Sequence, residues 1–236
     1  EVFPLTAMND MNKSNIISSI RSINPRGQTN LWGGIEKAIT ILDNRDDKTR
    51  NGNILLLTDG VPNISPSRGE VDTIKRLRNN KNFTSAIYTF GFGYNLKQNL
   101  LYDIAKCCNG NNAHISDGGM IATVFCNFIS IILTTVVVNL QLIVKTYSGK
   151  KLESDFILGD YESNYLYDTC STKFDIGTVQ IQQTRDIIMK LDKNETYEYY
   201  YTYKIGGKVY KSDVVVIDNN YVKSINKNVN VDIHKN

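Results

Sequence analysis

The first half of the chain alternates short apolar runs with segments in which apolar residues recur every three or four positions. The short runs predict strands, and the recurring positions predict helices with one apolar face. The expected strands span residues 2–5, 54–58, 85–91 and 113–116, and the expected helices span residues 8–23, 31–42, 70–78, 96–107 and 119–133. This alternation predicts an α/β fold, a doubly wound and mostly parallel sheet with helices on both faces.

The strand expected at 54–58 has an abrupt end. Four consecutive apolar residues, Ile54 to Leu57, lead directly into Thr58, Asp59 and Gly60. A continuous apolar run is typical of a central parallel strand that is buried on both faces. We therefore expect Asp59 to stand at the carboxyl end of a central strand.

The pattern changes near residue 136, where short alternating runs follow one another with little sign of helix. These runs span residues 138–147, 161–170, 177–184, 186–191, 196–205 and 208–218. Their spacing is typical of a β-sandwich, and the Gly206–Gly207 pair predicts a hairpin. We expect three parts: an α/β domain over 1–135, a β-sandwich over 136–222, and a polar tail over 223–236.

The longest apolar stretch, residues 120–138, raises the question of a membrane helix. A membrane-spanning helix needs about 20 mostly apolar residues, and polar residues such as Asn127, Ser130 and Thr134 interrupt this one. A buried helix that runs into a strand is the preferred interpretation, and we expect no membrane span.

Composition narrows the functional classes only modestly. Hydrophobic residues make up 41% and charged residues 22% of the 236 residues, which is a globular balance. The net charge of +3, without a Lys/Arg block, does not favour nucleic-acid binding. Cys107, Cys108, Cys126 and Cys170 lack zinc-site spacing, and we expect reduced thiols in an intracellular or virion-associated protein. The frequent Asn, Ile, Lys and Tyr indicate an AT-rich genome, such as that of a large DNA virus or a protist.

Two oxygen-bearing residues are candidates for a metal site. Ligands of open α/β sheets bind beyond the carboxyl ends of the strands, where Asp59 is expected. Thr29 lies in the GQTN segment just before the helix expected at 31–42. A carboxylate and a hydroxyl suit a hard cation such as Mg²⁺. The alternative is that both residues only cap a turn and a helix start.

Three motifs in order, GQTNLWGGIEKAITIL, NILLLTDGVPN and SAIYTFGFG, resemble a von Willebrand factor type A domain. The resemblance covers residues 1–135, and the opening EVFPLTAMND is similar to the third strand of that family. The all-β portion resembles, by position and strand rhythm, the sandwich that follows such domains in VWA–Hint type proteins.

The resemblance implies a metal-ion-dependent adhesion site. In that family the site combines an Asp-x-Ser-x-Ser loop with a threonine and an aspartate. Thr29 corresponds to the threonine that binds Mg²⁺ (or Mn²⁺ or Ca²⁺) directly, and Asp59 to the aspartate that acts through water. A carboxylate of a protein partner would fill the open metal position.

The sequence contains no Asp-x-Ser-x-Ser motif. By resemblance, the first two strands of the domain are absent. In the sheet, they would lie between the strand expected at 2–5 and the strand expected at 54–58. We expect an N-terminal segment or a separate chain to complete the sheet, since unpaired edges are unfavourable. Metal binding is expected only when that segment is present.

Other chemistry is weakly indicated, and we expect no enzymatic activity. Only two histidines, His114 and His234, could serve a catalytic triad. The GFGYN segment at 91–95 lacks a full phosphate-loop pattern and is interpreted as a turn. The tyrosines of 197–203 are interpreted as core residues of a strand rather than as an exposed binding stripe.

Three functional hypotheses follow. The first is a non-enzymatic protein-binding or adhesion module with a Mg²⁺-dependent rim. The second is a structural or assembly component whose metal site is idle. The third is the scaffold part of a larger processing enzyme or ubiquitin ligase.

Overall fold

The structure is a computed structural model that describes residues 3–24, 27–81 and 83–218. The chain forms two compact units, Glu1–Leu133 and Thr134–Asn236. The polar tail expected at 223–236 lies outside the described residues.

Unit 1 is built on a parallel three-stranded sheet in the order β1-β2-β3. The strands are β1 (Asn53–Thr58), β2 (Ala86–Phe92) and β3 (Asn112–Ile115). The register pairs Asn53 with Ala86 through Thr58 with Gly91, and Thr89 with Asn112 through Phe92 with Ile115. The parallel strands and their helical crossovers confirm the expected α/β class.

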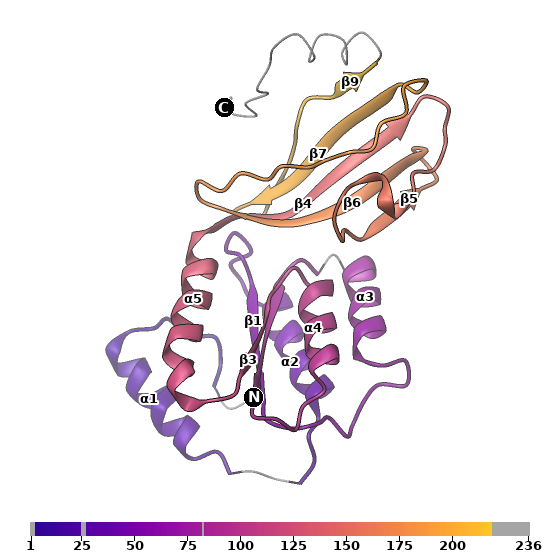
Figure 1. The fold of residues 1–236 in the computed structure, drawn as a ribbon. Coiled ribbons are helices and arrows are strands. Elements are labelled where there is room, and N and C mark those ends of the chain that lie inside the picture. The colour runs from indigo at the N-terminus through magenta and orange to yellow at the C-terminus, as the bar shows by residue number, and fades with distance from the viewer. Residues whose placement is uncertain (1–2, 25–26, 82, 219–236) are drawn as a thin grey trace. The chain divides into compact units, whose positions relative to one another are not determined.

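Helices cover both faces of this sheet (Figure 1). On one face, α2 (Leu31–Asp43), α3 (Glu70–Lys81) and α4 (Gln98–Cys107) pack on β1 and β2. On the other, α5 (Ile121–Thr134), preceded by the 3₁₀ turn η1 (Gly118–Met120), packs on β2 and β3. Phe128 of α5 contacts both Tyr88 and Phe90, with ring centroids 5.5 and 4.5 Å apart.

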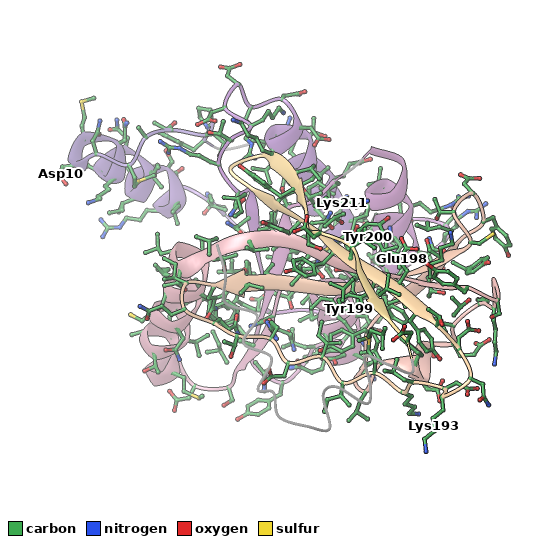
Figure 2. All side chains as sticks on the ribbon, turned by 90° about the horizontal axis from the view of Figure 1, so that it is seen from above. Asp10, Lys193, Glu198, Tyr199, Tyr200 and Lys211 are labelled. Atoms are coloured by element: carbon green, nitrogen blue, oxygen red, sulfur yellow. The ribbon has the colours of Figure 1, made fainter. Side chains whose placement is uncertain are left out.

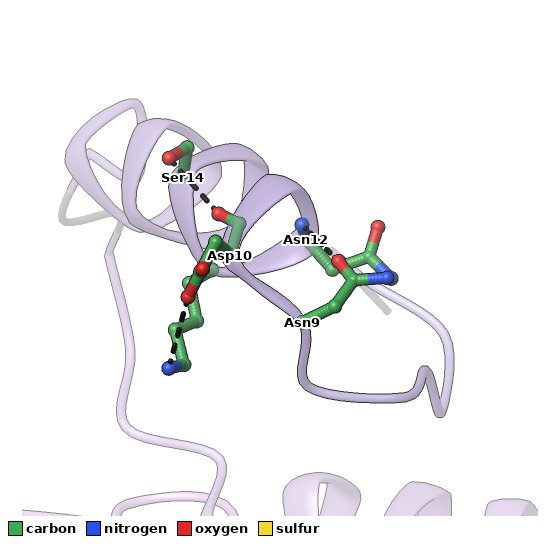
Figure 3. Close-up of polar contacts among 5 residues, drawn as sticks. Asn9, Asp10, Asn12 and Ser14 are labelled. Carbon is green, nitrogen blue, oxygen red and sulfur yellow. Dashed lines mark hydrogen bonds and ion pairs between the residues drawn. The ribbon is translucent and has the colours of Figure 1, made fainter.

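Helix α1 (Asp10–Arg21) is formed by local signals alone. Asn9 caps it by accepting a hydrogen bond of 2.8 Å from the Asn12 amide (Figure 3). Lys13 Nζ lies 3.4 Å from Asp10 Oδ1, a pairing of adjacent turns. The helix buries none of its residues, and Met11 and Ile20 are 70% and 59% exposed.

Two expectations for unit 1 are wrong. Residues 3–5 are irregular, so the strand expected at 2–5 is not found there, and Val2 lies outside the described residues. Pro4 cannot donate a backbone hydrogen bond to a ladder.

Strand β1 is buried on one face only, because Leu55 and Leu57 are 38% and 50% exposed. The apolar run had predicted burial on both faces, but α5 covers the side chains of β2 rather than those of β1.

Unit 2 contains one antiparallel six-stranded sheet, in the order β5-β6-β4-β7-β8 with β9 also paired to β7. The strands are β4 (Thr135–Thr146), β5 (Ser163–Leu166), β6 (Ser171–Gln180), β7 (Tyr197–Ile205), β8 (Lys208–Lys211) and β9 (Val215–Ile217). Gly206 and Gly207, with φ of +55° and +77°, form the expected hairpin between β7 and β8.

The described residues do not form the second sheet that a β-sandwich requires. Leu142, Val144 and Phe174 lie on one face of the sheet, and irregular segments and the short 3₁₀ turn η2 (Ser154–Phe156) cover them. The run expected as a strand at 186–191 makes only an isolated bridge, Ile157 with Met189. Its Ile187 and Met189 pack against the core cluster, so this apolar segment covers the sheet instead of extending it.

The tyrosines of β7 alternate between the two faces of the sheet. Tyr197 is 4% exposed and packs in the core with Tyr199. Tyr200 lies on the opposite face, where Lys211 Nζ sits 3.9 Å from its ring centroid (Figure 2). The interpretation of the tyrosine run as mainly core-facing therefore holds for Tyr197 and Tyr199.

The apolar stretch at 120–138 forms α5 and the start of β4, as expected. None of the helices in the described ranges combines the length and the apolar character needed to span a bilayer. All four cysteines are outside disulfides; Cys107 and Cys108 are buried, and Cys126 and Cys170 are exposed.

Candidate functional site

The carboxyl end of β1 carries Asp59 to an exposed position. Ile54 and Leu56 anchor the strand in the core beneath it. The buried Thr58 hydroxyl donates to the Gly60 carbonyl at 3.1 Å and accepts from the Gly60 amide at 3.4 Å. These two bonds fix the turn that follows the strand, and Asp59 projects from that turn into solvent.

Thr29 lies in the loop that leads into α2. Asn30 caps this helix by accepting from the Gly33 amide at 2.8 Å, so the helix start is satisfied without the Thr29 side chain. The alternative in which the Thr29 hydroxyl caps α2 is therefore not the arrangement observed.

Two hydrogen bonds join the Thr29 loop to the segment after β1. The Thr29 amide donates to Asn63 Oδ1 at 2.9 Å, and the Asn63 amide donates to the Thr29 carbonyl at 3.1 Å. They connect positions 34 residues apart in the sequence. Both use backbone groups of Thr29, which leaves its hydroxyl outside this pair.

The Thr29 hydroxyl faces the turn that carries Asp59. A Cβ atom built on Gly60 would lie 3.6 Å from Thr29 Oγ1, with no other heavy atom within 4 Å. The hydroxyl is thus a near neighbour of Gly60, and Thr29 and Asp59 lie on two neighbouring segments at the carboxyl end of β1. Glycine leaves space beside the hydroxyl that a side chain would occupy.

Thr29 and Asp59 offer oxygen ligands of the right chemical kind, but they are too few to complete the coordination of a metal ion. A carboxylate and a hydroxyl are oxygen ligands of the kind that Mg²⁺ prefers, but Mg²⁺ requires six in octahedral geometry. Within the described part of the chain, no three or more His, Cys, Asp or Glu side chains gather where an ion could bind. Thr29 and Asp59 by themselves therefore do not fill the coordination shell of such an ion.

Asn63 is the residue that sequence reasoning missed. The sequence indicated no role for it, whereas its side chain and amide hold the Thr29 loop in place. Its role depends on the meeting of two distant loops, and no local pattern encodes that meeting.

The other chemical candidates are occupied by structural contacts. His114 Nε2 lies 2.6 Å from the Gly93 carbonyl, and its ring is edge-on to Tyr94. Gly93, in the segment considered as a phosphate loop, has φ +77° and donates to the Ile115 carbonyl at 3.0 Å. This segment is therefore a tight turn at a strand end, as expected.

The parallel sheet with helices on both faces defines a Rossmann-like α/β domain. The sequence model of the von Willebrand factor type A domain matches residues 1–125, more than half of the chain. The chain belongs to this family, whose domains typically serve as adhesion or protein-binding modules.

Solved structures support the same fold. A von Willebrand factor type A protein from Catenulispora acidiphila matches 89% of this chain and 51% of its own length, with a TM-score of 0.69 and 13% identity. At that identity, the likeness shows the fold alone. The chain spans about half the length of that structure.

Two further structures are less similar. The ArnB paralog VWA2 from Sulfolobus acidocaldarius has a TM-score of 0.41 and 16% identity, over 86% of this chain and 51% of its own. Proximal thread matrix protein 1 from the mussel byssus, with a zinc-occupied MIDAS motif, has a TM-score of 0.42 and 21% identity, over 54% and 30%. Scores this low carry no argument about the site. No curated protein matches the chain in sequence.

Proposed function

We propose that this chain is a non-enzymatic protein-binding module whose contact surface is the rim formed by Thr29 and Asp59. The observation that supports it is the position of Thr29 Oγ1 beside the Asp59–Gly60 turn at the carboxyl end of β1. A hydroxyl and a carboxylate that meet at this edge can share one divalent ion.

Each residue has its own part in the proposal. Thr29 would ligate the ion, Mg²⁺ or alternatively Mn²⁺ or Ca²⁺, directly, and Asp59 would act through a bound water. When bound, the ion would supply positive charge at the rim, and this charge would attract a carboxylate of the partner protein. The hydrogen bonds to Asn63 hold the Thr29 loop in register with the Asp59 turn.

The proposal includes a second polypeptide segment. Mg²⁺ takes six oxygen ligands, of which Thr29 and Asp59 would supply two at most. In this proposal an N-terminal segment or a separate chain adds further ligands and completes the sheet. Metal binding should then depend on that segment. We also propose an intracellular or virion-associated location.

The test compares the Asp59→Ala variant with the unchanged full-length protein in a Mg²⁺ titration. Binding of a carboxylate-bearing partner, captured from the source cell and identified, should rise with Mg²⁺ and fall in EDTA. Asp59→Ala should weaken it at least tenfold. Asp103→Ala, which removes an exposed carboxylate from α4, is the matched control and should bind normally.

A structural or assembly component with an idle metal site is the second candidate, favoured by the absence of a three-ligand cluster among the described residues. It predicts that Asp59→Ala does not change partner binding and that partner binding does not depend on Mg²⁺. The third candidate is the scaffold part of a larger processing enzyme or ubiquitin ligase. It predicts that the complete gene product also contains a catalytic domain.

A further inference from the structure

The hairpin of β7 and β8 in unit 2 ends in an exposed tip that carries apolar and basic residues together. The two apolar residues of the tip, Ile205 and Val209, are 40% and 65% exposed. Each is the register partner of a lysine, Ile205 of Lys208 and Val209 of Lys204. The tip therefore presents apolar surface and positive charge side by side.

Two tyrosines form a rung behind this tip. Tyr203 and Tyr210 are register partners, and their rings stack with centroids 5.5 Å apart and 17° between the ring planes. Because each ring covers one face of the other, the pair leaves less open aromatic surface for stacking nucleic-acid bases. Tyrosine, with an apolar ring and a polar hydroxyl, is enriched at membrane–water interfaces.

The charge of the hairpin has one sign. Residues 199–212 contain Lys204, Lys208 and Lys211 but no aspartate or glutamate. In the described part of the chain, none of these lysines pairs with a carboxylate, and Lys211 Nζ instead lies over the Tyr200 ring (Figure 2). Burial lowers the pKa of Lys204, so an anion brought close to it would favour its charged form. The complementary partner is therefore anionic.

The apolar and basic residues occur on both faces of the hairpin. Side chains alternate between the two faces of a strand, so the register places Ile205, Lys208 and Tyr210 on one face and Lys204 with Val209 on the other. A protein partner would cover one of these faces, whereas a lipid layer surrounds an inserted tip on every side. The distribution therefore favours a lipid surface.

The order of the residues along the hairpin also matches the layers of a membrane surface. From the tip inwards, the rungs are Ile205–Lys208, Lys204–Val209, Tyr203–Tyr210 and Thr202–Lys211. At about 3.4 Å per residue, these three steps span about 10 Å. Interfacial protein segments bury their apolar face about 5–10 Å into the boundary between headgroups and acyl chains. An apolar tip, a tyrosine rung and flexible lysines thus lie at the depths that suit them.

We propose that the β7–β8 hairpin docks on a lipid bilayer that contains anionic lipids. Ile205 and Val209 enter the boundary between headgroups and acyl chains, and Lys204, Lys208 and Lys211 bind the anionic headgroups. This contact is peripheral and needs no membrane-spanning helix. It goes beyond the proposed protein-binding function, because it uses residues of unit 2 and requires no divalent ion.

The experiment mixes the full chain with large unilamellar vesicles in EDTA and measures the bound fraction by sedimentation. One set of vesicles contains equal parts of phosphatidylcholine and phosphatidylserine, and the other contains phosphatidylcholine alone. EDTA makes the result independent of the proposed Mg²⁺ rim. We expect at least tenfold stronger binding to the anionic vesicles, which weakens with added salt because salt screens the charges. Equal binding to both sets, or binding to neither, would overturn the proposal.

Three variants locate the contact, each checked for an unchanged circular dichroism spectrum. Lys208→Gln should weaken binding to the anionic vesicles about fivefold, since a lysine near such a surface contributes about 1 kcal/mol, and Val209→Asp should weaken it at least tenfold. Lys193→Gln is the matched control and should bind normally. Lys193 is exposed in the loop before β7, and Figure 2 shows it well apart from Lys211. Equal losses in the two lysine variants would contradict docking through the hairpin.

Fluorescence quenching reports insertion without relying on a loss of binding. Val209→Trp places a tryptophan at the tip, and Tyr167→Trp places one at an exposed position between β5 and β6. With anionic vesicles whose acyl chains are brominated, Val209→Trp should be quenched more than the unchanged protein, and Tyr167→Trp should not. The proposal fails if Val209→Trp shows no added quenching. It also fails if the chain binds a single-stranded oligodeoxynucleotide but not the vesicles.

Discussion

Thr29 and Asn63 hold each other through a reciprocal pair of hydrogen bonds, 2.9 Å from the Thr29 amide to Asn63 Oδ1 and 3.1 Å from the Asn63 amide to the Thr29 carbonyl. The pair joins the loop before α2 to the segment after β1. The proposed rim depends on this connection because Thr29 and Asp59 come from these two segments.

Replacing Asn63 with alanine should loosen the Thr29 loop. The variant loses one hydrogen bond at an exposed position, so we expect a decrease of about 0.5–1.5 kcal/mol in the free energy of unfolding. Chemical denaturation measures this loss. Asn63→Asp keeps the acceptor oxygen and should retain most of the stability; an equal loss in both variants would argue against the side-chain bond.

The Thr29 hydroxyl can be tested separately from the Thr29 backbone. Thr29→Val has nearly the same shape and keeps both bonds to Asn63, so stability should change by less than about 1 kcal/mol. Mg²⁺-dependent partner binding should fall at least tenfold, because the proposed ligand oxygen is gone. Thr29→Ser retains that oxygen and should bind nearly normally, and Mg²⁺-dependent binding that survives in Thr29→Val would remove Thr29 from the site.

Gly110 lies close to the backbone of β2. A Cβ atom there would lie 1.9 Å from the Ile87 carbonyl oxygen on β2, and backbone cannot yield as a flexible side chain can. We expect Gly110→Ala to cost at least about 3 kcal/mol, measured by thermal or denaturant unfolding.

Gly34 is the matched control for this substitution. It lies in α2 with no atom within 4 Å of a built Cβ. Alanine has the higher helix propensity, so Gly34→Ala should stabilise the protein by about 0.5–1 kcal/mol. Similar losses in both variants would mean that the contact with Ile87 is not the cause.

Asp155 and Lys190 make a pH-sensitive ion pair in unit 2. Lys190 Nζ donates to Asp155 Oδ2 at 2.9 Å, and this hydrogen bond with its accompanying charge attraction lowers the pKa of Asp155 below 3.8. Because the folded-state pKa is depressed, the stabilising contribution is complete above the unfolded value. It is lost as the pH falls through the lower folded-state pKa.

Carboxyl NMR titration can follow this group directly. Lys190→Gln should raise the Asp155 pKa towards 3.8, and added salt should shift it in the same direction because both side chains are exposed. A titration midpoint unchanged by Lys190→Gln would show that the pair does not persist in solution.

Hydrophobic periodicity predicted most elements because each is stabilised by local spacing. The segment Ile54–Leu57 predicted a strand, and the apolar spacing around Ile35 and Ile39 predicted α2. The start of strand β6 was not predicted correctly, because the strand begins at Ser171, six residues before the run expected at 177–184. Gly177, interpreted as a strand start, has φ +98° at a register shift within the strand, and a bulge resembles a turn in sequence.

The sequence by itself determined the α/β class of unit 1 and the placement of Asp59 at a strand end, and it selected Thr29 as a candidate site residue. Only the tertiary structure decided that Asn63 joins their loops. Among the described residues, it also decided that β1 pairs along one edge and that unit 2 forms one sheet. Periodicity records which side chains share a face of one element. The partner that covers that face is set by contacts between distant segments, which no local pattern contains.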